Sequence, residues 1–197
     1  MKRNIFALLA IAALSAGCWD IDTFFEKTAV GNNFLAFTLN TTRIYQRMAL
    51  YGPITRYATY SLQDEKMVVA ADLSHKIFNS IYIILPLSKV SDGAEIIPDI
   101  RLQYLLLPEI KRQTERSNGE IAYVIDRQNV YKNIVIEKCA VSIRSWNPEK
   151  HIVAGDFTFK GYYVDSLAKK HFVQVKDGVF DVSDENARYF ESKINSL

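Results

Sequence analysis

The chain has 197 residues, of which 24 are lysine or arginine and 22 are aspartate or glutamate. This length is enough for one domain with its own hydrophobic core, and the balanced charge gives no electrostatic reason to expect nucleic acid as a partner. There are only two cysteines, Cys18 and Cys139, which excludes a scaffold built on several disulfides.

The first 17 residues have the three parts of a secretory signal peptide. Lys2 and Arg3 are followed by an apolar stretch over residues 5–14 and by three small residues directly before Cys18. The stretch is shorter than the roughly 20 apolar residues that a spanning helix needs. We predict a signal peptide over residues 1–17. Its removal takes away two basic residues and no acidic one, so 22 basic residues then balance 22 acidic ones.

The residues Leu-Ser-Ala-Gly-Cys at positions 14–18 resemble the lipobox of bacterial lipoproteins, in which the cysteine receives a diacylglycerol. The resemblance implies that Cys18 carries acyl chains such as palmitate and that residues 18–33 form a lipidated tether. Ser15 departs from the branched apolar residue of the lipobox pattern, and a soluble exported protein is the alternative. Trp19 follows the cysteine where an aspartate would retain the protein at the inner membrane. The resemblance therefore points to the outer membrane, at its periplasmic or cell-surface face.

Beyond the tether, short runs rich in Ile, Val, Tyr, Phe and Thr are separated by Gly, Pro, Asn and Asp, which is typical of consecutive β-strands. No helix long enough for a crossover lies between them, so we expect antiparallel pairing. The charged stretch 108–119 is predicted to be an exposed loop. The predicted strands are 34–39, 43–50, 56–62, 67–73, 80–85, 100–106, 120–126, 133–137, 140–146, 152–164, 172–176 and 179–182.

Helical spacing appears only at the end of the chain. Ser183 can cap a helix whose Ala187, Phe190, Ile194 and Leu197 share one face, and we expect that face to pack on the sheet rather than to bind a partner. The sequence therefore predicts one all-β domain over residues 34–197. Its expected architecture is an antiparallel β-sandwich or flattened barrel of about ten strands, with a short C-terminal α-helix.

A second resemblance lies near the C-terminus. Gly155, Phe157 and Phe159 form the pattern G-x-F-x-F, and residues 177–182 read D-G-V-F-D-V. This signature resembles that of a family of uncharacterised Bacteroidota lipoproteins and covers about the last fifth of the chain. The resemblance implies a lipoprotein with a β-rich domain and implies no activity. From the residues alone, Asp177 and Gly178 are expected to form a turn between two strands.

No motif in the sequence indicates catalysis. It has no G-x-S-x-G elbow, P-loop or dinucleotide fingerprint, and its three histidines lack the spacing of a zinc site. Neighbouring strands could bring His151, His171 and Asp156 together as a composite metal site, which is the weaker interpretation. Cys139 lies in an apolar alternation that favours a buried small hydrophobic residue. We predict no catalytic residue, metal site or cofactor, and a protein that is not an enzyme.

Two groups of residues are candidates for binding or modification. Tyr45, Tyr51, Tyr57 and Tyr60 lie on strands that we expect to be adjacent, where they would form a face for a protein or glycan ligand. The alternative is the ordinary boundary of a half-buried sheet. The tripeptide from Asp165 to Leu167 resembles the Bacteroidota O-glycosylation sequon, which implies that Ser166 is glycosylated in an exposed hairpin loop.

Three functional hypotheses follow. The first is a lipid-anchored, non-enzymatic binding or structural module of the cell envelope. The second is a lipocalin-like barrel that carries a small apolar ligand, and the third is an envelope hydrolase. A barrel should enclose a cavity lined by apolar side chains, whereas a sandwich should have a filled core.

Overall fold

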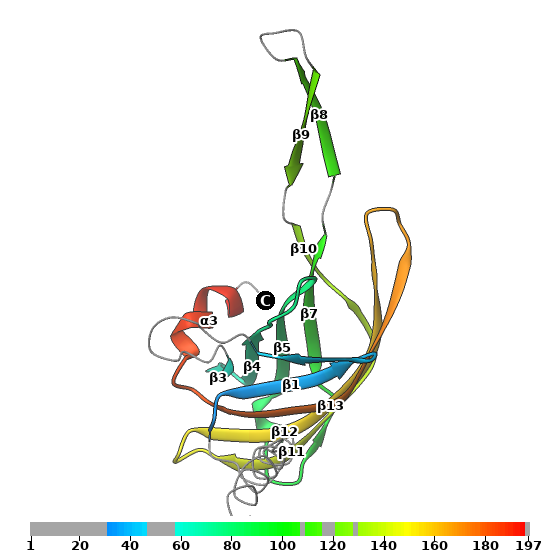
Figure 1. Ribbon diagram of the computed structural model, residues 1–197. Coiled ribbons are helices and arrows are strands. Elements are labelled where there is room, and N and C mark those ends of the chain that lie inside the picture. The colour runs from blue at the N-terminus through cyan, green and yellow to red at the C-terminus, as the bar shows by residue number, and fades with distance from the viewer. Residues whose placement is uncertain (1–30, 47–57, 107–108, 116–120, 128–129, 196–197) are drawn as a thin grey trace, which may run out of the picture.

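The computed structural model describes residues 31–46, 58–106, 109–115, 121–127 and 130–195. Cys18, most of the tether, Tyr51, Tyr57 and Leu197 lie outside these ranges. The described strands form two large antiparallel sheets and a separate two-stranded sheet (Figure 1). This architecture confirms the predicted all-β fold with a short C-terminal helix.

The six-stranded sheet has the order β2-β1-β13-β12-β11-β6. Its middle is a meander of three long consecutive strands, joined by two hairpins. Their pairing brings residues from the last third of the chain side by side on one face of the sheet. The strands are β1 (Phe34–Leu39), β2 (Thr42–Tyr45), β6 (Glu95–Ile96), β11 (Val135–Asn147), β12 (Ile152–Val164) and β13 (Lys170–Ser183).

The five-stranded sheet has the order β10-β7-β5-β4-β3. A short 3-10 helix, η1 (Leu87–Lys89), follows β5. The chain passes from this sheet to the other at Ile134, a buried residue whose N–H donates to the Leu102 carbonyl at 3.0 Å. The strands are β3 (Ala58–Gln63), β4 (Lys66–Asp72), β5 (Phe78–Pro86), β7 (Asp99–Leu106) and β10 (Val130–Asn133).

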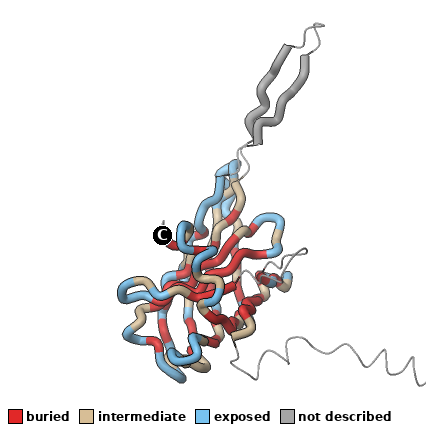
Figure 2. The backbone as a smooth tube through the Cα atoms, turned by 90° about the vertical axis from the view of Figure 1, so that its left-hand side faces the viewer, coloured by how far each residue is buried: buried red, intermediate tan, exposed pale blue. Residues whose placement is uncertain are grey.

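Side chains fill the space between the two sheets. Alternating residues of each strand point inward, and aromatic rings meet there, with Phe37 and Phe157 at 5.8 Å and Tyr60 and Trp146 at 5.6 Å between ring centroids. Buried residues run along the strands, while exposed ones gather at the turns (Figure 2). Within the described ranges the interior is therefore the packed core of a sandwich.

The helix α3 (Ala187–Ile194) covers the outer face of the five-stranded sheet. Phe190 and Ile194 pack there with Val68, Ala70, Tyr82 and Ile84, which confirms the expected core packing. The helix begins later than a cap at Ser183 would place it. Ser183 ends strand β13, and its hydroxyl donates to Asn33 Oδ1 at 2.9 Å.

Asp72 on strand β4 holds helix α3 against the sheet through polar contacts. Its carboxylate, which is nearly buried, accepts hydrogen bonds from Lys193 Nζ at 3.0 Å and from the Tyr189 hydroxyl at 2.9 Å. The helix is therefore held by a charged pair as well as by its apolar face.

Several strand predictions are wrong. The two strands predicted over 133–137 and 140–146 are one continuous strand, β11, whose period is interrupted by a β-bulge between Ile136 and Lys138. The stretch predicted as a loop over 108–119 contains β8 (Glu109–Glu115), which pairs with β9 (Ile121–Arg127) in a hairpin that projects from the end of β7 and β10 (Figure 1). The predicted turn at Asp177 and Gly178 lies inside the continuous strand β13. There it forms a β-bulge, because three residues of β13 span two residues of β12 and of β1.

Candidate binding surface on the six-stranded sheet

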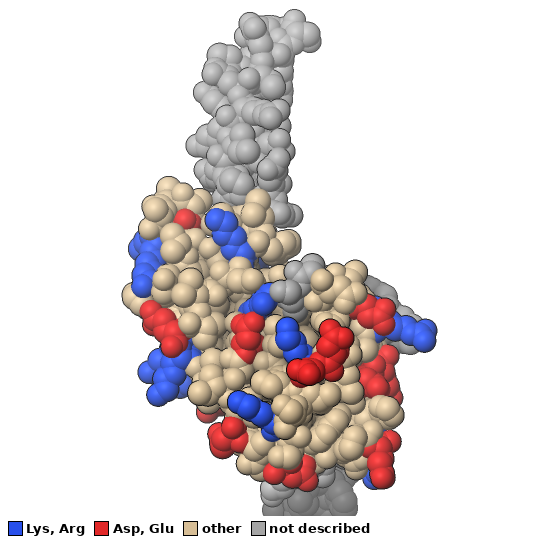
Figure 3. Space-filling view, turned by 180° about the vertical axis from the view of Figure 1, so that it is seen from behind, with Lys and Arg blue, Asp and Glu red and all other residues tan. Residues whose placement is uncertain are grey.

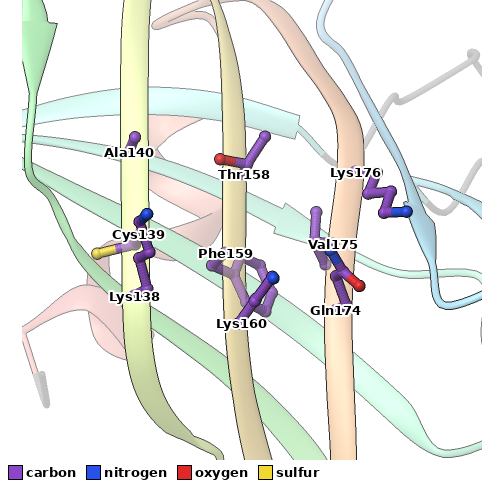
Figure 4. A pocket seen from close by; sticks show the side chains of 9 residues that line it. All are labelled: Lys138, Cys139, Ala140, Thr158, Phe159, Lys160, Gln174, Val175 and Lys176. Carbon is purple, nitrogen blue, oxygen red and sulfur yellow. The ribbon is translucent and has the colours of Figure 1, made fainter.

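A shallow hollow of about 250 Å³ lies on the six-stranded sheet. Three neighbouring strands each contribute three consecutive residues, 138–140 from β11, 158–160 from β12 and 174–176 from β13 (Figure 4). Strand alternation points the middle residue of each triplet, such as Phe159 and Val175, toward the core. The outer residues of each triplet therefore form the hollow.

Long and short side chains alternate around the hollow. Lys138, Lys160 and Gln174 lie opposite one another across the three strands. Ala140 and Thr158 are paired in the next row, beside Lys176. Two short side chains thus lie between longer ones, which explains why this part of the sheet is hollowed.

The charges at the hollow are of one sign. Lys138 and Lys160 are directly opposite each other and exposed, an arrangement that is unfavourable between like charges. Among the described residues, no carboxylate lies within ion-pair distance of these two lysines or of Lys176. The hollow is therefore suited to an anionic group.

A row of three apolar side chains borders the hollow, of which Val135 and Phe172 are exposed and Tyr162 is half-buried. Val135, Tyr162 and Phe172 are paired across β11, β12 and β13, one row beyond Lys138 and Lys160. Phe172 is 66% exposed, and its ring meets that of Tyr162 edge-on at 6.2 Å between centroids. Lys170 Nζ lies 3.4 Å from the centre of the Tyr162 ring.

We call this region the lysine–aromatic surface. Its charged side chains are all lysines, whereas basic and acidic side chains are mixed on the side of the molecule seen in Figure 3. The surface comprises Val135, Lys138, Ala140, Thr158, Lys160, Tyr162, Lys170, Phe172, Gln174 and Lys176.

The loop that joins β12 to β13 borders the same surface. Asp165 Oδ1 accepts hydrogen bonds from the N–H groups of Leu167 and Lys169, both at 2.9 Å, and Oδ2 lies 2.7 Å from His171 Nε2. The hydrogen bond to His171 and those to the backbone lower the pKa of the Asp165 carboxyl. Ser166 is exposed in this loop. Its position agrees with the expected hairpin, and its glycosylation stays a prediction.

The predicted tyrosine face is wrong for the two tyrosines that the structure describes. Tyr45 lies on β2 of the six-stranded sheet and is 39% exposed, whereas Tyr60 lies on β3 of the other sheet and is 1% exposed. Burial, together with the charge of Asp184, raises the pKa of Tyr60 to about 12. Tyr51 and Tyr57 lie outside the described residues.

The composite metal site is also wrong. His151 precedes β12 and pairs with Asp184 at 2.9 Å, whereas His171 is opposite Tyr163 near the far end of that strand. In the described ranges, no group of three or more His, Cys, Asp or Glu side chains could hold a metal ion. Cys139 is half-buried against the core, where burial raises the pKa of its thiol.

Sequence reasoning missed the lysine–aromatic surface. The sequence did contain a signal, because residues two apart in a strand lie on the same face. Tyr162 therefore shares a face with Thr158 and Lys160, and Phe172 shares a face with Gln174. An aromatic residue on the polar side of a strand indicates an exposed ring.

No family model, curated protein or solved structure matches this chain. The described part of the chain has no helix that is both long and apolar enough to cross a bilayer. The fold and the surface therefore define the protein as an antiparallel β-sandwich with a basic, aromatic sheet face.

Proposed function

We propose that this protein is a lipid-anchored component of the bacterial outer membrane and that its β-sandwich binds a ligand without catalysing a reaction. The lysine–aromatic surface carries the binding part of the proposal. The leader and the cysteine context at positions 1–18 carry the anchoring part.

The start of the domain supports a tether. The Gly31 N–H donates to Asp181 Oδ1 at 2.8 Å, so the chain is attached to β13 before β1 begins. Residues 19–30 would then separate the lipid from the domain, and they span at most about 40 Å when fully extended. Two or three acyl chains on one cysteine hold a small domain firmly at a bilayer.

The chemistry of the surface favours binding over hydrolysis. Its titratable side chains are lysines and Tyr162. The carboxylate of Glu137 borders it, 4.0 Å from Lys170 Nζ, but no carboxylate of the described residues lies within ion-pair distance of Lys138, Lys160 or Lys176 in the hollow. The packed interior gives no support to a lipocalin-like carrier, which needs an apolar cavity between its strands.

Replacement of Cys18 tests the anchor. We expect the wild-type protein to incorporate labelled palmitate and to sediment with outer membranes, and Cys18→Ala to lose the label and move to the soluble fraction. Cys139→Ala is the matched control, because it removes a thiol that lies in the folded domain. An unlabelled, soluble wild-type protein would refute the anchoring proposal and leave ligand binding to be judged separately.

A further inference from the structure

We infer that the lysine–aromatic surface binds an anionic saccharide. A pyranose ring lies against the exposed ring of Phe172 beside Tyr162, and its carboxylate, sulfate or phosphate group enters the lysine-lined hollow. The inference deepens the proposed function, since it names the ligand class of the proposed binding surface.

The aromatic row supplies the part that recognises a sugar. Phe172 offers an exposed ring, and Tyr162 beside it is held in place by the ring contact and by Lys170. A flat aromatic face is suited to the C–H face of a sugar ring, and a tyrosine hydroxyl adds a hydrogen bond at the wet edge. Exposed Val135 and Phe172 on either side of Tyr162 form an apolar patch on the sheet face, and such patches mark binding sites.

The hollow supplies the part that recognises charge. Three lysines line it, one from each of three neighbouring strands, so positive charge lies around the space above Ala140 and Thr158 (Figure 4). Lysine binds carboxylate, sulfate and phosphate as a compact positive charge with three donors. The Thr158 hydroxyl and the Gln174 amide add neutral hydrogen-bonding groups for sugar hydroxyls. A volume of about 250 Å³ suits one small charged unit rather than a large ligand.

The position of the surface favours a ligand away from the anchoring bilayer. Gly31, where the tether ends, lies against Ile152 and Ser183 at one end of β12 and β13. Tyr162 is ten residues further along β12, or roughly 33 Å at the usual rise of a strand. The surface thus lies near the opposite end of these strands from the tether, which favours a glycan over the lipid surface that holds the protein.

Calorimetric titration of the full-length protein in neutral detergent tests the inference. The ligands are hexagalacturonate and a heparin-derived hexasaccharide, with neutral maltohexaose, a hexaglutamate peptide and phosphatidylglycerol vesicles for comparison. We expect at least one of the two anionic saccharides to bind, at least tenfold more tightly than maltohexaose or hexaglutamate, and more weakly as salt is raised.

Matched variants locate the site. Combined replacement of Lys138, Lys160 and Lys176 by alanine, and separately Phe172→Ser, should each weaken saccharide binding at least tenfold. The controls are alanine replacement of the exposed Lys66, Lys89 and Lys150, which removes the same charge elsewhere, and Ile97→Ser, which removes an apolar side chain that is 82% exposed. Both controls should bind as the wild type does.

Three results would overturn the inference. They are binding to vesicles but to neither anionic saccharide, equal binding of hexaglutamate that Phe172→Ser does not weaken, and no binding to either anionic saccharide. Because the titration does not depend on where the protein resides, its failure is distinct from failure of the Cys18 test.

Discussion

Replacing Gly178 by alanine should strongly destabilise the domain, although the added group is one methyl. A Cβ at this position would overlap the Phe157 carbonyl oxygen and lie 2.9 Å from two atoms of its ring. The oxygen belongs to the neighbouring strand, so it can yield only if the β12–β13 ladder shifts. Overpacking of this kind costs about 1–3 kcal/mol, and the backbone contact places Gly178→Ala near 3 kcal/mol.

Urea unfolding followed by fluorescence measures this loss, because Trp146 packs against Tyr60 in the core. Asp177→Gly is the companion variant. Asp177 has a φ of +50°, so glycine relieves backbone strain there, but it also raises the conformational entropy of the unfolded chain. Because these two effects oppose each other, we expect the free energy of unfolding to change by less than about 0.5 kcal/mol. A Gly178→Ala protein within about 1 kcal/mol of the wild type would refute the close packing of the bulge.

Three further predictions concern other parts of the fold. Phe190→Ala should lower the free energy of unfolding by about 3 kcal/mol, because Phe190 is fully buried between helix α3 and the sheet. Replacement of the exposed Glu191 by alanine should have little effect. Equal urea midpoints for the two variants would contradict this packing of the helix. Tyr60→Phe should leave the free energy of unfolding unchanged or raise it by up to about 1 kcal/mol, because the buried hydroxyl has no hydrogen-bond partner among the described residues. A loss of more than about 1 kcal/mol in the same assay would show that the hydroxyl does make a hydrogen bond. The carboxyl of Asp165 should titrate below its ordinary value of 3.8 by NMR, and His171→Phe should raise that midpoint. Because this pKa is lowered on folding, the stabilisation is present above the ordinary value and is lost as pH falls through the folded one; an unchanged midpoint in the variant would refute the role of His171.

Strands with one buried face could be predicted from the sequence. The predicted range 152–164 coincides with β12. In β12, Val153, Phe157 and Phe159 are buried at odd positions, while Thr158 and Lys160 are exposed at even ones. Such alternation follows directly from packing one face against a core.

Strands β8 and β6 were not predicted. β8 pairs with β9 in a sheet separate from the sandwich, so no packing on the core requires an apolar alternation in it. Its sequence EIKRQTE is mostly polar, whereas its partner IAYVIDR has the apolar run by which a strand was predicted there. The two-residue strand β6 is too short to have a period at all. The predicted tyrosine face is wrong because β2 and β3 belong to different sheets. A short stretch of sequence does not show which strands are neighbours in space.

The bulge in β13 connects the missed strand to the candidate site. Before the bulge, even-numbered residues such as Phe172 and Lys176 face outward; after it, even-numbered Phe180 and Val182 are buried in the core. One inserted residue moves the even-numbered side chains from the outer face to the core face. This interruption of the two-residue alternation is why the sequence predicted two strands and a turn. The Arg43 Nη1 that donates to the Asp177 carbonyl at 2.8 Å satisfies a backbone group of the bulge.

The same device lets one strand serve the core along its whole length and still present the lysine–aromatic surface outside. Without the extra residue, either Phe180 would turn to solvent or Phe172 and Lys176 would turn into the core. Burying an unpaired ammonium costs far more than the strain of a bulge. The bulge is therefore a condition for the surface, and the D-G-V-F-D-V pattern at positions 177–182 is explained by the packing of β13 between β1 and β12.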